Sequence, residues 1–124
     1  MTPDEFVSAL RQVVLEQSVD TTLSAVEHPP GRRPSRELVE ASVWYSRLTE
    51  EDRAQVRAIA AMVAHDAVFG MLAVLDGARA VESTPTKGRF HLTFHKDGKT
   101  WDLSPPDGVP LHDLLNAEDV RKLQ

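Results

Sequence analysis

The first half of the chain repeats its hydrophobic residues at the spacing of an α-helix. The segment Thr2-Pro3-Asp4-Glu5 has the residues of a helix start: a capping threonine, a proline at the first position and a glutamate three residues after the cap. The apolar positions that follow keep this period as far as Gln17 and comprise Phe6, Leu10, Val13 and Val14. The pattern predicts one helix that ends near Ser18 and a second, short helix from Asp20 to about Val26.

A proline-rich loop comes next and separates these helices from a third one. Residues 28–34 hold three prolines and one glycine, which deny the backbone regular structure. Ser35 is a capping residue for a helix over about 36–47. Trp44 and Tyr45 are adjacent in this helix, so we expect one ring to enter the core and the other to lie at the surface, where aromatic side chains favour interfaces.

The longest predicted helix begins after Thr49, where three acidic residues occupy the first turn. Its polar face disappears over 67–75, so we expect this half to be surrounded by protein, and we expect Gly77 to end the helix in a left-handed conformation. Residues 58–75 have the length of a membrane span, but His65-Asp66 interrupts their centre. We therefore predict a buried helix in a soluble, cytoplasmic protein that does not contact the membrane.

The period changes from 3.6 to 2 near the C-terminal end. Residues 89–95 and 100–103 alternate between apolar and polar, and Asp97-Gly98 between them is a favoured hairpin turn. This turn pairs Phe94 with Trp101. The apolar face of the hairpin, which we expect to pack on the helices, comprises Phe90, Leu92, Phe94, Trp101 and Leu103.

A short helical turn over 111–114 and a last helix over about 117–123 complete the pattern. We predict a mainly helical α+β fold of about four helices and short C-terminal turns, with one antiparallel β-hairpin at about 89–104. A chain of 124 residues suits a single domain, here residues 1–124.

Composition restricts the chemistry that this domain can carry. No cysteine is present, which excludes disulfides, thiolate metal sites and a cysteine nucleophile. The 14 basic and 19 acidic residues give a net charge of −5, which disfavours sequence-independent binding of nucleic acid. The basic cluster of Arg32, Arg33 and Arg36 keeps a nucleic-acid-binding accessory as one alternative function.

The polar face of the predicted hairpin carries His91, His95 and Asp102. The two histidines lie on the same side of one strand, roughly 13 Å apart along it. A zinc ion bound at about 2.0–2.1 Å by each imidazole does not easily join them, so we expect neither a metal nor another cofactor. A small metal-dependent hydrolase or metal-binding protein, with these three residues as its catalytic or ligating groups, stays open as an alternative.

His65 and Asp66 are the polar residues in the middle of the longest helix. Adjacent helical residues point about 100° apart. This spacing puts Asp66 on the side of Ile59, Met62, Val63 and Phe69, and His65 nearer to Ala58, Ala61 and Leu72. We predict that Asp66 is a partly buried carboxylate paired with an arginine or an indole N–H, as burial requires.

Three segments of the chain resemble a family of small uncharacterised bacterial proteins over residues 35–116. They are Trp44-Tyr45-x-x-Leu48-Thr49-Glu50-Glu51-Asp52, the stretch from Val68 to Gly77, and Leu111-His112-Asp113-Leu114-Leu115-Asn116. No activity is established for that family, so the resemblance implies no catalytic residue. In size and charge the chain is also similar to bacterial immunity proteins and other small accessory proteins.

The sequence therefore favours a non-enzymatic protein–protein interaction module, a small acidic accessory or immunity-like protein that binds another protein. Its negative charge can steer association with a basic partner. The surface aromatic ring of Trp44 or Tyr45, together with Arg32 and Arg33, marks the expected contact region. The same aromatic pair and the apolar stretch 67–75 also predict a homodimer.

Overall fold

The computed structural model describes residues 1–122 and, within them, four helices and one β-hairpin. The first helix is continuous and consists of α1 (Pro3–Leu10), the π-helical segment η1 (Arg11–Glu16) and α2 (Gln17–Glu27). The elements that follow are α3 (Arg36–Ser46), α4 (Glu50–Leu75), β1 (Thr93–Lys96), β2 (Lys99–Asp102) and α5 (Leu111–Lys122). The mainly helical α+β class predicted above is confirmed.

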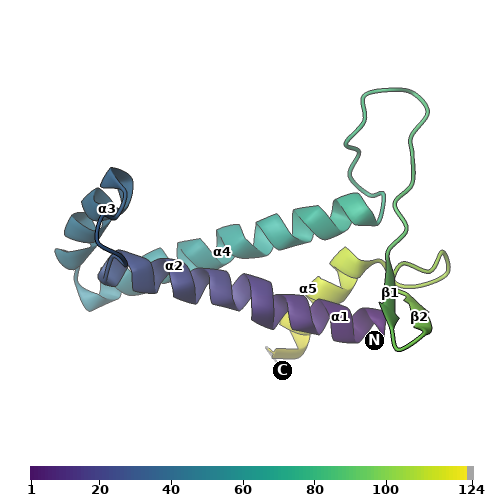
Figure 1. Cartoon of the computed structure of the whole chain (residues 1–124), viewed down its shortest axis with the longest axis horizontal. Coiled ribbons are helices and arrows are strands. Elements are labelled where there is room, and N and C mark those ends of the chain that lie inside the picture. The colour runs from purple at the N-terminus through teal and green to yellow at the C-terminus, as the bar shows by residue number, and fades with distance from the viewer. Residues whose placement is uncertain (123–124) are drawn as a thin grey trace.

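Two long helices form the frame of the molecule (Figure 1). The helix α1–η1–α2 and helix α4 run side by side in opposite directions, and α3 packs against α2 at one end. At the other end α5 contacts both α1 and α4, and the hairpin stands beside the start of α1. The frame therefore has a third helix at each end, and between them one face of the two long helices stays uncovered.

The first helix does not break near Ser18, and the separate helix from Asp20 to Val26 is not formed. Neither glycine nor proline interrupts the segment, so the helix continues to Glu27. The wide π-helical turns change which residues face inward. Val13 and Val14 are 60% and 42% exposed. The buried positions instead recur every four residues: Val7, Arg11, Leu15, Val19 and Leu23.

The predicted helix starts are confirmed by their capping contacts. The Thr2 hydroxyl accepts from the Glu5 N–H at 3.2 Å, and the Glu5 carboxylate accepts from the Thr2 N–H at 2.8 Å. The hydroxyls of Ser35 and Thr49 accept from backbone N–H groups three residues later, both at 3.2 Å. Gly77 follows α4 with φ +76°, the predicted left-handed end.

The hairpin has the predicted register, with Phe94 opposite Trp101 and the turn at Asp97 and Gly98. These two turn residues have φ values of +51° and +74°. Pairing extends past the strands, since the Leu103 N–H donates to the Leu92 carbonyl at 2.9 Å.

Part of the predicted apolar face of the hairpin packs inward. Leu103 is 2% exposed, and Leu92 packs against the core. Phe94 and Trp101 are half-buried and contact each other, with 5.7 Å between ring centroids, but neither packs against the two hydrophobic clusters. Phe90 is 54% exposed, so its predicted inward position is wrong. In the hairpin register, Phe90 would pair with Pro105. Proline has no N–H group to donate, so the hydrogen bonds between the two strands stop before Phe90.

The C-terminal segment forms one helix, α5, where a turn and a separate helix were predicted. Pro110 precedes it, and no helix-breaking residue lies inside it. Leu111 and Leu115, one turn apart, are both 0% exposed and give the helix a single buried face.

Two hydrophobic clusters stabilise the two ends of the frame. The cluster at the α5 end consists of Val7, Leu72, Leu111 and Leu115, and the cluster at the α3 end consists of Val19, Leu23 and Tyr45. Tyr45 is 5% exposed and Trp44 is 54% exposed, which confirms the predicted split of the two rings. The Arg53 guanidinium lies 4.9 Å from the centroid of the Tyr45 ring.

Helix α4 is much less buried than predicted. Gly70, Leu72 and Ala73 are buried, but Met71 is 60% exposed and Ala67 is also exposed. By length and composition, α4 is the one helix in residues 1–122 that could cross a membrane, and 17% of its 18-residue apolar window is buried. A core helix of a soluble protein passes the same test, so this is weak evidence for a membrane span, and cytoplasmic localisation stays a prediction.

Candidate functional site

An apolar surface lies between the two long helices. A groove of about 440 Å³ separates η1–α2 from α4. The residues that shape it are Val14, Ser18 and Thr22 on one side and Ala60, Ala64 and Ala67 on the other. No charged residue lines this groove, so it offers apolar contact and little else.

The adjoining face of α4 is also apolar and open to solvent. Ile59, Met62 and Val63 are 60%, 65% and 64% exposed. Asp66 lies among them with its side chain 85% exposed. The predicted neighbours of Asp66 are therefore right for these three residues, but Phe69, predicted on the same side, stacks on His65 instead. The predicted burial of Asp66 and its pairing with an arginine or indole are also wrong, because no element covers this face of α4. We call Ile59, Met62, Val63 and Asp66 the α4 face.

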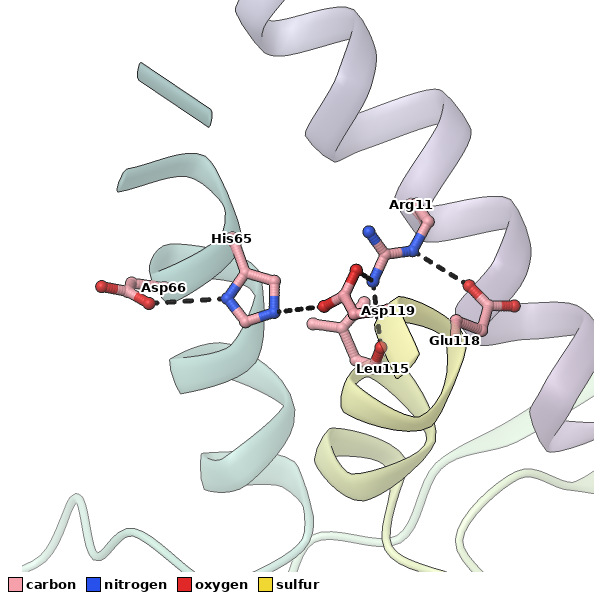
Figure 2. Close-up of polar contacts among 6 residues, drawn as sticks. All are labelled: Arg11, His65, Asp66, Leu115, Glu118 and Asp119. Carbon is pink, nitrogen blue, oxygen red and sulfur yellow. Dashed lines mark hydrogen bonds and ion pairs between the residues drawn. The ribbon is translucent and has the colours of Figure 1, made fainter. Parts of the chain in front are cut away.

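His65, the neighbour of Asp66, points the other way, toward α5 (Figure 2). Its side chain is 27% exposed, and its ring stacks on Phe69 with 6.1 Å between centroids. Its Nε2 lies 3.0 Å from the Asp119 carboxylate without the geometry of a hydrogen bond, and its Nδ1 lies 3.5 Å from the Asp66 carboxylate. His65 therefore links α4 to α5.

Arg11 is the centre of this polar cluster (Figure 2). It is 7% exposed; its Nε is 3.0 Å from the Glu118 carboxylate, and its Nη2 is 2.7 Å from that of Asp119. The same Nη2 donates to the Leu115 carbonyl at 2.9 Å. With two carboxylates and a carbonyl on one guanidinium, the cluster fastens α5 to the first helix. Sequence reasoning missed Arg11, although it stands four residues from both Val7 and Leu15.

A second buried pair holds the start of α5. The Asp76 carboxylate, 7% exposed, accepts from the His112 backbone N–H at 2.9 Å and lies 2.7 Å from His112 Nδ1. Phe69 meets the imidazole edge-on at 5.3 Å between centroids. The pair joins the end of α4 to the start of α5, a contact that the sequence did not predict for Asp76.

The hairpin histidines point outward, as predicted, and divide between two environments. His91 Nε2 lies 3.0 Å from the Asp102 carboxylate. His95 instead lies 2.9 Å from the hydroxyls of both Thr93 and Thr100. The hydrogen bond from His91 is the main cause that lowers the pKa of Asp102, and the Ser104 backbone N–H, 2.9 Å away, lowers it further.

Candidate metal ligands are not grouped in the part of the chain that the structure describes. Among residues 1–122, no three His, Cys, Asp or Glu side chains lie where they could hold a metal ion together. The contact between His91 and Asp102 is the feature that bears on the alternative of a metal-dependent hydrolase. That alternative stays a prediction.

The basic cluster lies at the α3 end of the molecule. Arg32 and Arg33 are exposed in the proline-rich loop, and Arg36 pairs with Glu40 at 2.8 Å on α3. The nucleic-acid alternative, which rests on these arginines, also stays a prediction.

Comparison with known proteins adds no residue assignments: no family model, curated protein or solved structure matches the chain. The functional argument therefore rests on the groove, the α4 face and the charges around them.

Proposed function

We propose that the protein is an interaction module that receives an amphipathic helix of a partner protein in the groove between η1–α2 and α4. The observation that carries the proposal is the α4 face, where Ile59, Met62 and Val63 are each at least 60% exposed beside a groove without charged residues. Monomeric proteins rarely expose large contiguous apolar patches, and such patches mark binding surfaces.

The shape of the groove suits a helix. Ala60, Ala64 and Ala67 lie at positions i, i+4 and i+7 along α4, on one side of that helix. Their short side chains let a third helix approach to the usual interaxial distance of about 8–10 Å. An apolar helical face laid into such a groove is a recurring mode of peptide recognition.

The negative charge of the two long helices indicates which residues should flank the apolar face of the partner helix. Residues 3–27 and 50–75, which form the two long helices, contain nine acidic and three basic residues, a net charge of −6. The carboxylates of Asp20 and Asp66 are 66% and 85% exposed, and Asp20 pairs with Arg57 at 2.8 Å. Complementary lysine or arginine side chains beside the apolar stripe would raise the association rate and specify the partner.

Photo-crosslinking in the native cell tests the proposal. A benzophenone amino acid at Val63 is expected to capture one protein through a helix with apolar residues three and four apart and with flanking Lys or Arg. The same probe at Val109, which is 59% exposed but distant from the groove, is the control. Ala64→Trp fills the groove and should abolish the cross-link. Ala58→Trp, exposed on α4 outside the groove lining, should preserve it.

Two outcomes overturn the proposal. If the probe at Val63 captures a second copy of this chain, the groove is a homodimer interface. If Val63 and Val109 capture the same proteins to the same extent, the groove has no specific occupant.

A further inference from the structure

Charge is distributed unevenly between the two ends of the molecule. Residues 77–101 contain five basic and two acidic residues, a net charge of +3, in a chain whose net charge is −5. This segment forms the long loop after α4 and the hairpin, at the end of the frame opposite α3 (Figure 1). An acidic protein thus carries a local basic surface, which the proposed helix groove does not use.

The loop after α4 borders two adjacent cavities of about 380 and 320 Å³, which share Gly77 and residues 87–90. The smaller cavity is lined by three basic side chains, Arg79, Lys87 and Arg89, and by one acidic side chain, Glu82. We call this smaller cavity the loop site. Its lining has two more positive than negative charges.

The charges of the loop site are only partly compensated within the protein. Among the side chains that the structure describes, the guanidinium groups of Arg79 and Arg89 have neither a hydrogen bond nor an ion pair. Lys87 Nζ donates to the Glu82 carbonyl at 2.5 Å. The Glu82 carboxylate accepts from the Gly88 N–H at 2.6 Å. The loop therefore supplies its own acceptor to Lys87 and leaves both guanidinium groups available.

The Arg79 guanidinium lies against Gly70 of α4. A Cβ atom on Gly70 would lie 2.7 Å from Arg79 Nη1, closer than real Cβ contacts allow. The Arg79 backbone is fixed nearby, since its N–H donates to the Ala73 carbonyl at 3.1 Å. One of the two unpaired guanidinium groups therefore lies directly against α4, and a side chain at position 70 would displace it.

Apolar side chains lie beside these cations. Val81 and Phe90 both line the loop site and are 64% and 54% exposed. The exposure of Phe90, which the alternation of the hairpin does not explain, gives the cavity an aromatic wall. A ligand that matches this lining has an anionic group and an apolar body.

We propose that the loop site binds a phosphate monoester whose ester group is apolar or aromatic. A phosphate monoester carries about −1.5 to −2 charges at pH 7, which matches the excess of two positive charges in the lining. Guanidinium groups bind phosphate oxygens in a fork of two parallel hydrogen bonds. Val81 and Phe90 then contact the ester group.

An NMR titration of the ¹⁵N-labelled full chain tests this inference with three probes: phenyl phosphate, inorganic phosphate and benzoate. Phenyl phosphate is expected to shift the amide signals of Gly77, Gly88 and Phe90, with a Kd at least tenfold lower than that of either other probe. Inorganic phosphate lacks the apolar body, and benzoate carries a single charge.

Variants assign the binding to the loop site. The double substitution Arg79→Gln and Arg89→Gln should raise the Kd for phenyl phosphate at least tenfold. Lys96→Gln with Lys99→Gln removes two charges from the same basic segment outside the cavity, and should change the Kd less than twofold. Gly70→Ala keeps every charge and displaces the Arg79 guanidinium, so it should raise the Kd severalfold without unfolding the protein.

Equal Kd values for phenyl phosphate and benzoate would overturn the inference. So would equal losses in the two double variants, or saturable shifts confined to Arg32 and Arg33. The groove proposal stands apart from this one: Ala64→Trp, which should abolish the cross-link, should leave the titration with phenyl phosphate unchanged.

Discussion

Helix α4 has apolar residues both in its middle and near its C-terminal end, but those that are buried all lie near the C-terminal end. Near its C-terminal end, Leu72 and Ala73 are 1% and 5% exposed. In its middle, Ile59, Met62 and Val63 are at least 60% exposed. The difference comes from α5, which contacts α1 and α4 and covers the face of α4 that carries Leu72 and His65, while no element covers the face that carries Ile59, Met62 and Val63. An apolar stretch of a helix predicts that another element packs on it. That element can belong to another protein molecule.

The largest expected effect tests the buried end of α4. Leu72→Ala removes a fully buried side chain next to Leu111 and Leu115 and should lower the free energy of unfolding by about 3 kcal/mol. Ile59→Ala, in the exposed middle, should change it by less than about 0.5 kcal/mol. Urea unfolding followed by circular dichroism measures both. Equal losses would mean that the middle of α4 is also covered in solution.

The next effect concerns the side chain that fastens α5. Arg11→Ala leaves the Glu118 carboxylate and the Leu115 carbonyl without their partner and leaves Asp119 with its contact to His65. The change should cost about 2 kcal/mol, since the carboxylates can still reach water. Arg57→Ala removes an ion pair with Asp20 that is exposed on both sides, and should cost less than about 0.5 kcal/mol. A loss for Arg11→Ala no greater than that for Arg57→Ala would contradict its buried position.

A smaller effect is expected in the hairpin turn. Gly98 has φ +74°, where an L side chain brings its Cβ close to the backbone. Gly98→Ala should therefore lower the free energy of unfolding by about 1 kcal/mol. Gly88→Ala, outside the left-handed region, is the control for removal of a glycine from this part of the chain. Thermal unfolding of both variants gives the comparison, which an unchanged melting temperature for Gly98→Ala would contradict.

The smallest effect is a dependence on pH. The folded-state pKa of Asp102 is lowered, mainly by the hydrogen bond from His91, so the charged form favours the folded hairpin. This contribution is present above the ordinary pKa of 3.8 and is lost as the pH falls through the lower folded value. Titration of the Asp102 carboxyl carbon by NMR should give a pKa below 3.8, and His91→Ala should raise it. An unchanged pKa in His91→Ala would rule out this cause.

Features that depend on neighbouring residues could be predicted from the sequence. The capping residues Thr2, Ser35 and Thr49 mark their helix starts because each cap contacts a backbone N–H three residues later. Asp97 and Gly98 set the hairpin register because a two-residue turn leaves no freedom in the pairing.

Features that depend on distant residues could not be predicted. The burial of Arg11 depends on Glu118 and Asp119, more than 100 positions away. The exposure of Asp66 and of the α4 face depends on which residues of α4 are in contact with α5. The spacing of apolar residues within α4 cannot predict these contacts. The π-helical η1 rotated Val13 and Val14 outward, which a pattern fitted to 3.6 residues per turn cannot represent.

The contact between α1 and α5 has a consequence for the synthesis of this protein. Val7 is synthesised about a hundred residues before its partners Leu111 and Leu115. At about 5–20 residues per second, Val7 and Leu72 wait for several seconds without their cover. During that interval Val7 on α1 and Leu72 on α4 stay without the side chains of α5 that later bury them, and a chaperone that binds exposed apolar segments would recognise them.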